Sequence, residues 1–218
     1  MTAAGLYREQ AEMDRIAHWE RIYSTKPPTE VSWYQPEPSL SLELIAAAGK
    51  GLDARVMDVG GGASVLVDRL LDRGCERVTV LDVSATALER AKARLGRRAE
   101  RVSWLVGDVT ELTVPEGAFD IWHDRALFHF LTEPGDRRKY AQAAVRALTP
   151  RGHVVIATFA IDGPPKCSGL DVARYSPATL QSELGPAFEL RETRTEVHTT
   201  PRGVQQPFLY ARFQRTGE

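Results

Sequence analysis

A run of glycines and three acidic residues are spaced along the chain in a way that suits a nucleoside ligand. Gly60–Gly62 follow Asp58 at the end of a short apolar run, and Asp82 and Asp108 each end a further apolar run. Glycines let the backbone turn tightly and approach a ligand with no Cβ in the way. A carboxylate at the end of the second strand can accept hydrogen bonds from ribose hydroxyls, and the third acid could receive an adenine amino group. The spacing therefore predicts a nucleoside-binding site.

The elements that must position these residues alternate between strand and helix. The predicted strands are 55–60, 76–82, 101–106, 119–123 and 152–159. The predicted helices between them are 63–73, 84–95 and 136–148. Such alternation indicates βαβ units and a parallel sheet, and right-handed crossovers then give a doubly wound α/β fold. Because the carboxyl ends of parallel strands share one edge, we expect the ligand to lie there.

The two ends of the chain differ from this pattern. After a loop over 162–172 and a helix over 177–184, the stretches 188–198 and 207–214 resemble strands joined by a turn. So short a connection makes the pair antiparallel. At the other end, residues 1–50 are predicted to form a helical extension or lid, and 51–218 the ligand-binding domain. The extension holds two predicted helices, 8–24 and one from Ser39 or Ser41 to Ala48, on either side of an aromatic, proline-rich loop over 31–38.

The residues around the glycine turn indicate which nucleotide is bound. Val65 stands where the phosphate-binding fingerprint needs a further glycine, and no P-loop motif occurs. The carboxylate of Asp58 would repel a pyrophosphate, whereas it suits a ligand that carries an ammonium and a sulfonium group. This favours S-adenosylmethionine over NAD, with an NAD-dependent oxidoreductase as an alternative hypothesis.

These motifs resemble those of the class I S-adenosylmethionine-dependent methyltransferases over roughly residues 15–214. Asp58–Gly62 resembles the first motif, Gly107–Val109 the adenine-contact motif, and Phe119–Asp120 the start of the fourth. Ser64 departs from the pattern, since the first motif usually ends in another glycine. The resemblance implies a Rossmann-like seven-stranded sheet of order 3-2-1-4-5-7-6 with the last strand antiparallel. The predicted cofactor-binding residues are Trp19, Tyr23, Tyr34, Asp58, Gly60, Gly61, Gly62, Asp82, Val83, Asp108, Val109 and His123.

Methyl transfer from a sulfonium is an in-line displacement, so the protein must align the acceptor, exclude water and sometimes remove a proton. Just beyond the predicted fourth strand stand three candidate catalytic residues, His123, Asp124 and Arg125. Either of the first two could act as a base, and Asp124 could also pair with Arg125 or hold an acceptor ammonium. Neighbouring strand positions point to opposite faces, so not all of them can reach one pocket. The predicted acceptor-pocket residues are Trp33, Tyr34, Phe128, His129 and Cys167.

The aromatic side chains of the extension suggest a lid over the methyl group. An electron-poor sulfonium is attracted to aromatic faces, and closing the extension would dry the site. The alternative is that Trp19 and its neighbours only pack the extension onto the domain. The extension also resembles a subgroup of small methyltransferases that includes protein-lysine methyltransferases.

Composition limits the remaining functions. The formal net charge is −1, which gives no field that would favour nucleic acid, and the two cysteines have no metal-ligand spacing, so no metal is expected. No stretch is long and apolar enough to span a membrane, so we expect a cytoplasmic monomer or homodimer. The leading hypothesis is methyl transfer to a small-molecule thiol, hydroxyl or amine, with S-adenosylhomocysteine as product. The alternatives are a protein-lysine methyltransferase and a non-catalytic protein that binds an adenosyl ligand.

Overall fold

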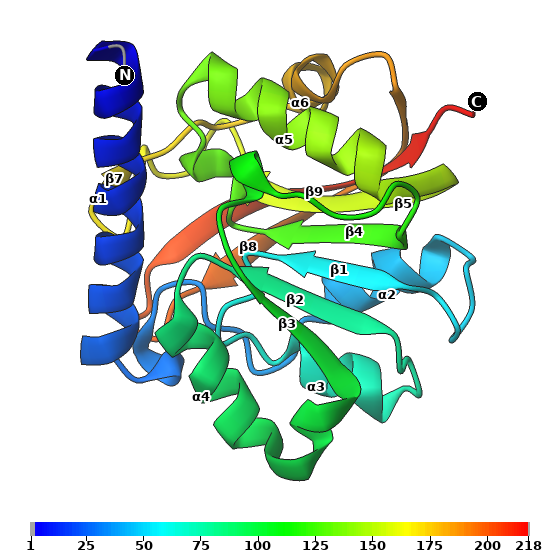
Figure 1. The fold of residues 1–218 in the computed structure, drawn as a ribbon, viewed down its shortest axis with the longest axis horizontal. Coiled ribbons are helices and arrows are strands. Elements are labelled where there is room, and N and C mark those ends of the chain that lie inside the picture. The colour runs from blue at the N-terminus through cyan, green and yellow to red at the C-terminus, as the bar shows by residue number, and fades with distance from the viewer. Residues whose placement is uncertain (1–2, 218) are drawn as a thin grey trace.

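A seven-stranded sheet with helices on both faces forms the body of the protein (Figure 1). The computed structural model describes the backbone of residues 3–217 and the side chains of residues 13–217. The helices are α1 (Ala3–Thr25), α2 (Ser39–Ala47), α3 (Leu66–Asp72), α4 (Ala85–Leu95), α5 (Pro134–Ala147) and α6 (Pro177–Leu184). The strands are β1 (Val56–Val59), β2 (Val78–Asp82), β3 (Val102–Val106), β4 (Phe119–Arg125), β5 (Leu148–Phe159), β6 (Lys166–Cys167), β7 (Leu170–Asp171), β8 (Phe188–Thr199) and β9 (Gln205–Arg215).

The strand order confirms the predicted sheet. It runs β3-β2-β1-β4-β5-β9-β8, which is 3-2-1-4-5-7-6 when the strands of this sheet are numbered along the chain. β1 to β5 are parallel, and β9 runs antiparallel to both β5 and β8. The segment 162–172, predicted as a loop, contains the small β6–β7 hairpin, in which Cys167 pairs with Leu170.

Two apolar layers hold helices against the sheet. α2, α3 and α4 pack on one face, where Ile121 of β4 points, and α5 and α6 pack on the other, where Trp122 points. Figure 1 shows α5 and α6 together on one side of the strands and α3 and α4 on the other. Since α2 contributes Leu42 and Ile45 to the same layer as α3, it is part of the packed core. The predicted division of the chain at residue 50 stays a prediction.

β4 is longer than the sequence predicts, and this changes the site. The expected strand ends at His123, whereas β4 continues through Asp124 and Arg125, which pair with Ile156 and Ala157 of β5. Strand alternation therefore places Asp124 on the opposite face from both of its neighbours. The strand ends at Arg125, and the next residue, Ala126, has a φ of 69°, in the left-handed region that non-glycine residues seldom adopt.

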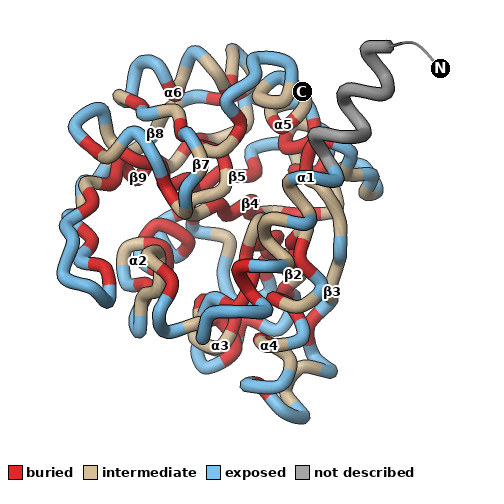
Figure 2. The backbone as a smooth tube through the Cα atoms, turned by 90° about the vertical axis from the view of Figure 1, so that its left-hand side faces the viewer, coloured by how far each residue is buried: buried red, intermediate tan, exposed pale blue. Residues whose placement is uncertain are grey.

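α1 stands across the carboxyl ends of the parallel strands (Figure 1). Its Glu20 carboxylate accepts a hydrogen bond from the Thr86 hydroxyl of α4, and its Arg15 forms an ion pair with Asp136 of α5 at 2.8 Å. Figure 2 views this edge of the sheet and shows buried segments gathered at its centre. The helix predicted over 8–24 is part of α1; residues 1 and 2 of the predicted extension lie outside the described ones.

Candidate active site

The glycine turn after β1 has three positions where a side chain does not fit. A Cβ would lie 2.6 Å from Leu127 Cδ1 at Gly60, 2.5 Å from Asp58 Oδ2 at Gly61 and 2.5 Å from the Tyr23 hydroxyl at Gly62. The Gly61 amide donates to Leu81 O at 3.1 Å, which ties the turn to β2. The result is a wall of bare backbone at the tip of β1, closed from above by α1.

The acids at the tips of β2 and β3 are in different states of pairing. Asp82 is buried, and its Oδ1 accepts a hydrogen bond from Ser84 N at 2.8 Å. Burial raises the Asp82 pKa to about 7, because no cation compensates the lost hydration. Asp108 accepts from Thr110 N at 2.8 Å through Oδ1 and from Arg15 at 2.9 Å through Oδ2. Asp82 is thus suited to further hydrogen-bond donors, whereas α1 already engages Asp108, the residue predicted to receive adenine.

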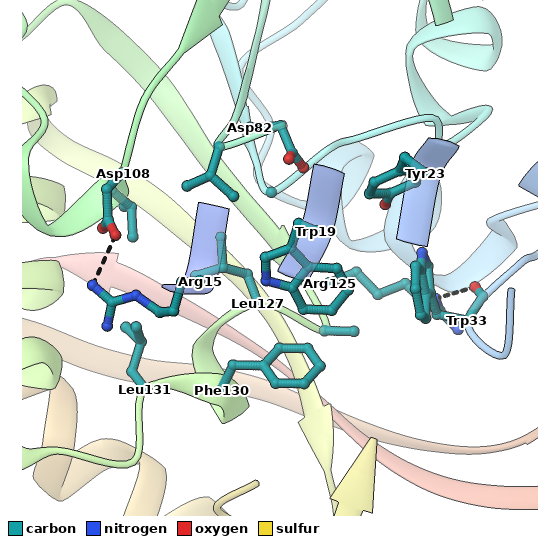
Figure 3. A pocket seen from close by; sticks show the side chains of 14 residues that line it. Arg15, Trp19, Tyr23, Trp33, Asp82, Asp108, Arg125, Leu127, Phe130 and Leu131 are labelled. Atoms are coloured by element: carbon teal, nitrogen blue, oxygen red, sulfur yellow. Dashed lines mark hydrogen bonds and ion pairs between the residues drawn. The ribbon is translucent and has the colours of Figure 1, made fainter. Parts of the chain in front are cut away.

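One cavity joins these strand tips to the aromatic residues of the extension (Figure 3). Five predicted cofactor residues line it at the tips of β1, β2 and β3: Gly60, Asp82, Val83, Asp108 and Val109. Four other predicted residues also line it: Trp19 and Tyr23 from α1, Trp33 from the loop that follows, and Arg125 from β4. Figure 3 shows Asp108 and Arg15 at one end, Trp33 at the other, and the Asp82 carboxyl pointing in between them.

A second cavity lies beside the first, and Tyr23, Trp33, Gly60 and Arg125 line both. The remaining predicted residues that line the second are Tyr34, Asp58, Gly61 and His123. The structure therefore brings all twelve predicted cofactor residues except Gly62 to the walls of two adjoining cavities. Gly62 lies in the same turn, against Tyr23.

His123 lies under the glycine turn and not at the acceptor end. Its Nδ1 is 2.7 Å from Asp58 Oδ1 and its Nε2 is 2.9 Å from Ser41 Oγ. All three side chains are buried. Because both ring nitrogens already have partners, the geometry does not agree with the expectation that His123 acts as a base toward an acceptor. It instead holds the Asp58 carboxylate against Gly61.

Asp124, the other predicted base, faces away from both cavities. It is fully buried against α5, where it accepts hydrogen bonds from the Tyr140 hydroxyl at 2.8 Å and from Leu127 N at 3.0 Å. Burial raises its pKa to about 6. The expectation that Asp124 meets the acceptor or pairs with Arg125 was wrong, because strand alternation sends the two side chains to opposite faces.

Phe128 and His129 belong to the core and not to the cavity walls. Phe128 is fully buried with its ring centroid 4.7 Å from that of Tyr140. His129 is fully buried beside Phe159, whose amide donates to His129 Nδ1 at 3.3 Å. Burial lowers the His129 pKa to about 3, so this imidazole is neutral at physiological pH. The prediction that these two residues line the acceptor pocket was wrong, since an apolar run this dense packs inward.

Cys167 lines a third cavity, which shares Trp33 with the other two. Its Sγ lies 3.9 Å from Ser32 Oγ, and burial raises its pKa to about 11. The thiol is therefore protonated at neutral pH and is a poor nucleophile. The segment that carries Trp33 therefore lies between Cys167 and the predicted cofactor residues.

Several wall residues were not predicted. Arg15, Leu127, Phe130 and Leu131 line the main cavity, and Ser41 reaches His123 from α2. Only the fold brings α1 and the turn after β4 together, so no local sequence signal marks them. Among residues 13–217, no three side chains of the metal-ligating types come together. None of the described helices is long and apolar enough to cross a membrane.

Comparison with known proteins agrees with this geometry. Residues 56–152 match the family model described as a methyltransferase domain. A 2-heptyl-1-hydroxyquinolin-4(1H)-one methyltransferase of Mycobacteroides abscessus is 32% identical over 150 residues, which are 65% of this chain and 63% of that protein. An eEF1A lysine and N-terminal methyltransferase of Bos taurus is 28% identical over 153 residues, 69% of this chain and 21% of that protein. The chain thus spans less than two thirds of either relative.

The same fold occurs in a solved structure. The N-methyltransferase NodS of Bradyrhizobium japonicum WM9, in complex with S-adenosylhomocysteine, superimposes with a TM-score of 0.69 at 21% identity, covering 90% of this chain and 95% of that one. Residues 56–152 therefore resemble a methyltransferase domain, and the chain as a whole has the fold of a solved methyltransferase structure.

Proposed function

We propose that the protein transfers a methyl group from S-adenosylmethionine to a small-molecule acceptor. The residues fit this cofactor: the bare backbone of the glycine turn admits close approach, and Asp82 is a buried carboxylate short of donors. In this proposal the Asp82 carboxylate accepts hydrogen bonds from the ribose hydroxyls. Asp58, which His123 holds in place, lines the second cavity and faces the cofactor's ammonium group. When bound, the cofactor supplies an electrophilic methyl group on a sulfonium.

The chain's own contribution is positioning and exclusion of water. Trp19, Trp33 and Phe130 form an aromatic enclosure beside the glycine turn, with Trp19 5.6 Å from Trp33 and 4.9 Å from Phe130 between ring centroids. Such an enclosure keeps water from the reacting atoms and holds an acceptor in line with the methyl group. Aromatic faces also attract a sulfonium. Two carboxyl groups, those of Asp82 and Asp108, line the same cavity, and this proposal assigns both to the adenosyl part of the cofactor and not to proton removal.

The observation that carries the small-molecule proposal is the lining of the cavity beside Trp33. Trp19 of α1, Trp33 and Phe130 line this end, and the charged side chain there is the cationic Arg125. A lysine methyltransferase would need an open channel with a carboxylate to receive an ammonium, and Asp124 is fully buried against α5. The quinolone-modifying relative, named for a small-molecule acceptor, supports the same reading.

The proposal is tested by labelled transfer. The purified chain is incubated with methyl-labelled S-adenosylmethionine and, separately, a small-molecule extract or a protein extract from the same cells. We expect S-adenosylhomocysteine and labelled small molecules from the first and no labelled protein from the second. Labelled lysines in the protein fraction would favour the lysine alternative. Binding of S-adenosylhomocysteine with no turnover in either fraction would favour a non-catalytic role.

A further inference from the structure

Arg125 is a cation whose charge is not balanced by a direct ion pair. Its Nε donates to the Tyr210 hydroxyl at 2.9 Å and its Nη1 donates to Trp33 O at 2.8 Å, and both acceptors are neutral. Its third nitrogen, Nη2, is buried and has no hydrogen-bond partner among the described residues. The nearest carboxylate in this network is Glu196, which accepts from the far side of the Tyr210 hydroxyl at 3.0 Å.

The other arginine of the cavity shows the contrast. Arg15 forms ion pairs with Asp108 at 2.9 Å and with Asp136 at 2.8 Å, so its charge is compensated. Arg125 is also fixed in place, because its guanidinium carbon lies 4.7 Å from the Phe208 ring centroid in addition to its two hydrogen bonds. A buried donor without a partner costs free energy, because its hydrogen bond to water has not been replaced. A bound acceptor atom would remove that cost.

The groups that face Arg125 from neighbouring elements do not cancel its charge. His129 and His198 have lowered pKa values, through burial and then the Arg125 charge, so both are neutral at pH 7. The Cys167 thiol is protonated there, since burial raises its pKa to about 11. These three groups therefore add no negative charge beside Arg125, and a sulfonium bound beside Gly60 would add positive charge.

The residues that line the cavity limit the chemistry of a ligand that could bind there. Trp19, Trp33 and Phe130 line the part of the cavity that Arg125 also lines, so the body of the occupant must be apolar. Among the three guanidinium nitrogens of Arg125, Nη2 is the one without a hydrogen-bond partner among the described residues. A phosphate or a dicarboxylate needs more donors than this, so the arrangement fits a single negative charge on an apolar body.

We propose that Arg125 binds the reacting group of the acceptor and that this acceptor is an apolar organic monoanion, with an ionised thiol or acidic hydroxyl. This inference rests on the proposed methyl transfer. The acceptor anion forms the new bond to the methyl group with its lone pair, while the S–C bond breaks and leaves its electrons on sulfur. The acceptor's proton has gone to solvent before binding, so the transfer step needs no base. One positive and one negative charge disappear, so the neutral product no longer binds the guanidinium.

The test uses 4-nitrophenol as a probe, with nitrobenzene as its neutral counterpart, on protein saturated with S-adenosylhomocysteine. We expect 4-nitrophenolate to bind at least about tenfold more tightly than nitrobenzene, and its absorbance titration to show a pKa lowered by about one unit. Arg125→Gln should remove both effects, and Arg125→Lys should restore part of them. Arg191→Gln, an exposed arginine of β8, is the matched control. Thiophenol methylation should fall about 100-fold in Arg125→Gln, as expected on losing a charged hydrogen bond.

The outcomes separate this inference from the proposed function. If S-adenosylhomocysteine itself fails to bind the wild-type protein, the proposed function fails. If it binds equally to wild type and Arg125→Gln, yet 4-nitrophenolate binds no better than nitrobenzene or binds the variant equally well, Arg125 is not an anion-binding residue and the inference is overturned.

Discussion

The two faces of β4 carry similar residue types and perform different tasks. His123 and Arg125 lie on the face toward α2, where one fixes Asp58 under the glycine turn and the other points to the acceptor end. Asp124 lies on the face toward α5, where it is satisfied by the Tyr140 hydroxyl and the backbone that follows β4. A polar residue near the carboxyl end of a parallel strand is therefore a site residue only if its side chain faces the site.

Asp124→Ala gives the largest effect expected on the α5 face. The substitution leaves Leu127 N and the Tyr140 hydroxyl without their acceptor, so the free energy of unfolding should fall by about 3 kcal/mol. Affinity for S-adenosylhomocysteine, measured well below the melting temperature, should change less than about twofold, because Asp124 reaches neither cavity. Urea unfolding and calorimetry measure the two quantities, with the exposed Asp171→Ala as control. A loss of cofactor affinity with unchanged stability would reverse the assignment of the two faces.

His123→Leu tests the α2 face. Loss of the imidazole leaves a buried Asp58 without its partner, so the free energy of unfolding should fall by about 2 kcal/mol. Affinity for S-adenosylhomocysteine should also fall by about tenfold, because Asp58 packs against Gly61 and an unpaired carboxylate disturbs that turn. The same two measurements apply. Stability loss with unchanged cofactor affinity would show that this face is structural as well.

Tyr140→Phe refines the comparison with a smaller change. The hydroxyl donates to Asp124 and accepts from Trp122 Nε1 at 2.8 Å, so its removal should cost about 1 kcal/mol of unfolding free energy. Cofactor affinity should not change. A more than additive effect in the Asp124→Ala, Tyr140→Phe double variant is not expected, because both substitutions break the same hydrogen bond.

The pH dependence of stability distinguishes a structural acid from a site acid. Burial raises the pKa of Asp124 to about 6 and that of Asp82 to about 7. A raised pKa in the folded state adds stability that is complete below the unfolded value near 4 and is lost as pH rises through the folded value. Asp124→Asn should therefore flatten the urea-unfolding profile between about pH 4 and 6, and Asp82→Asn should flatten it between about pH 4 and 7, so that between about pH 6 and 7 only Asp82→Asn has an effect.

Bound S-adenosylhomocysteine should affect only one of these two contributions. Ribose hydroxyls that donate to Asp82 favour its ionised form, so binding near pH 6.5 should release a proton, which calorimetry in buffers of different ionisation enthalpy detects. Asp124 should titrate unchanged in the complex. Proton release that persists in Asp82→Asn and vanishes in Asp124→Asn would contradict this assignment.

The fold and the gathering of the glycine turn and its acids at one edge of the sheet were predictable because their signals are local. The glycine turn, Asp82 and Asp108 each follow an apolar run directly, so strand recognition alone brings them to one edge. The acceptor end was predictable only in part. The extent of β4 and its pairing with β5 decide which face Asp124 takes, and a two-residue error in a strand end exchanges a structural residue for a site residue. Arg15 and Ser41 come from helices whose docking depends on tertiary packing, which no local pattern encodes.

The central claim is that the adenosyl ligand lies over the tip of β1 with its ribose held by Asp82. Calorimetric titration of the wild-type protein and Asp82→Asn with S-adenosylhomocysteine tests it directly. The account predicts one site per chain in the wild type and an affinity at least about 30-fold weaker in the variant, the loss expected for charged hydrogen bonds to ribose, with circular dichroism unchanged. Absence of binding to the wild-type protein, or equal affinity in the two proteins, would contradict it.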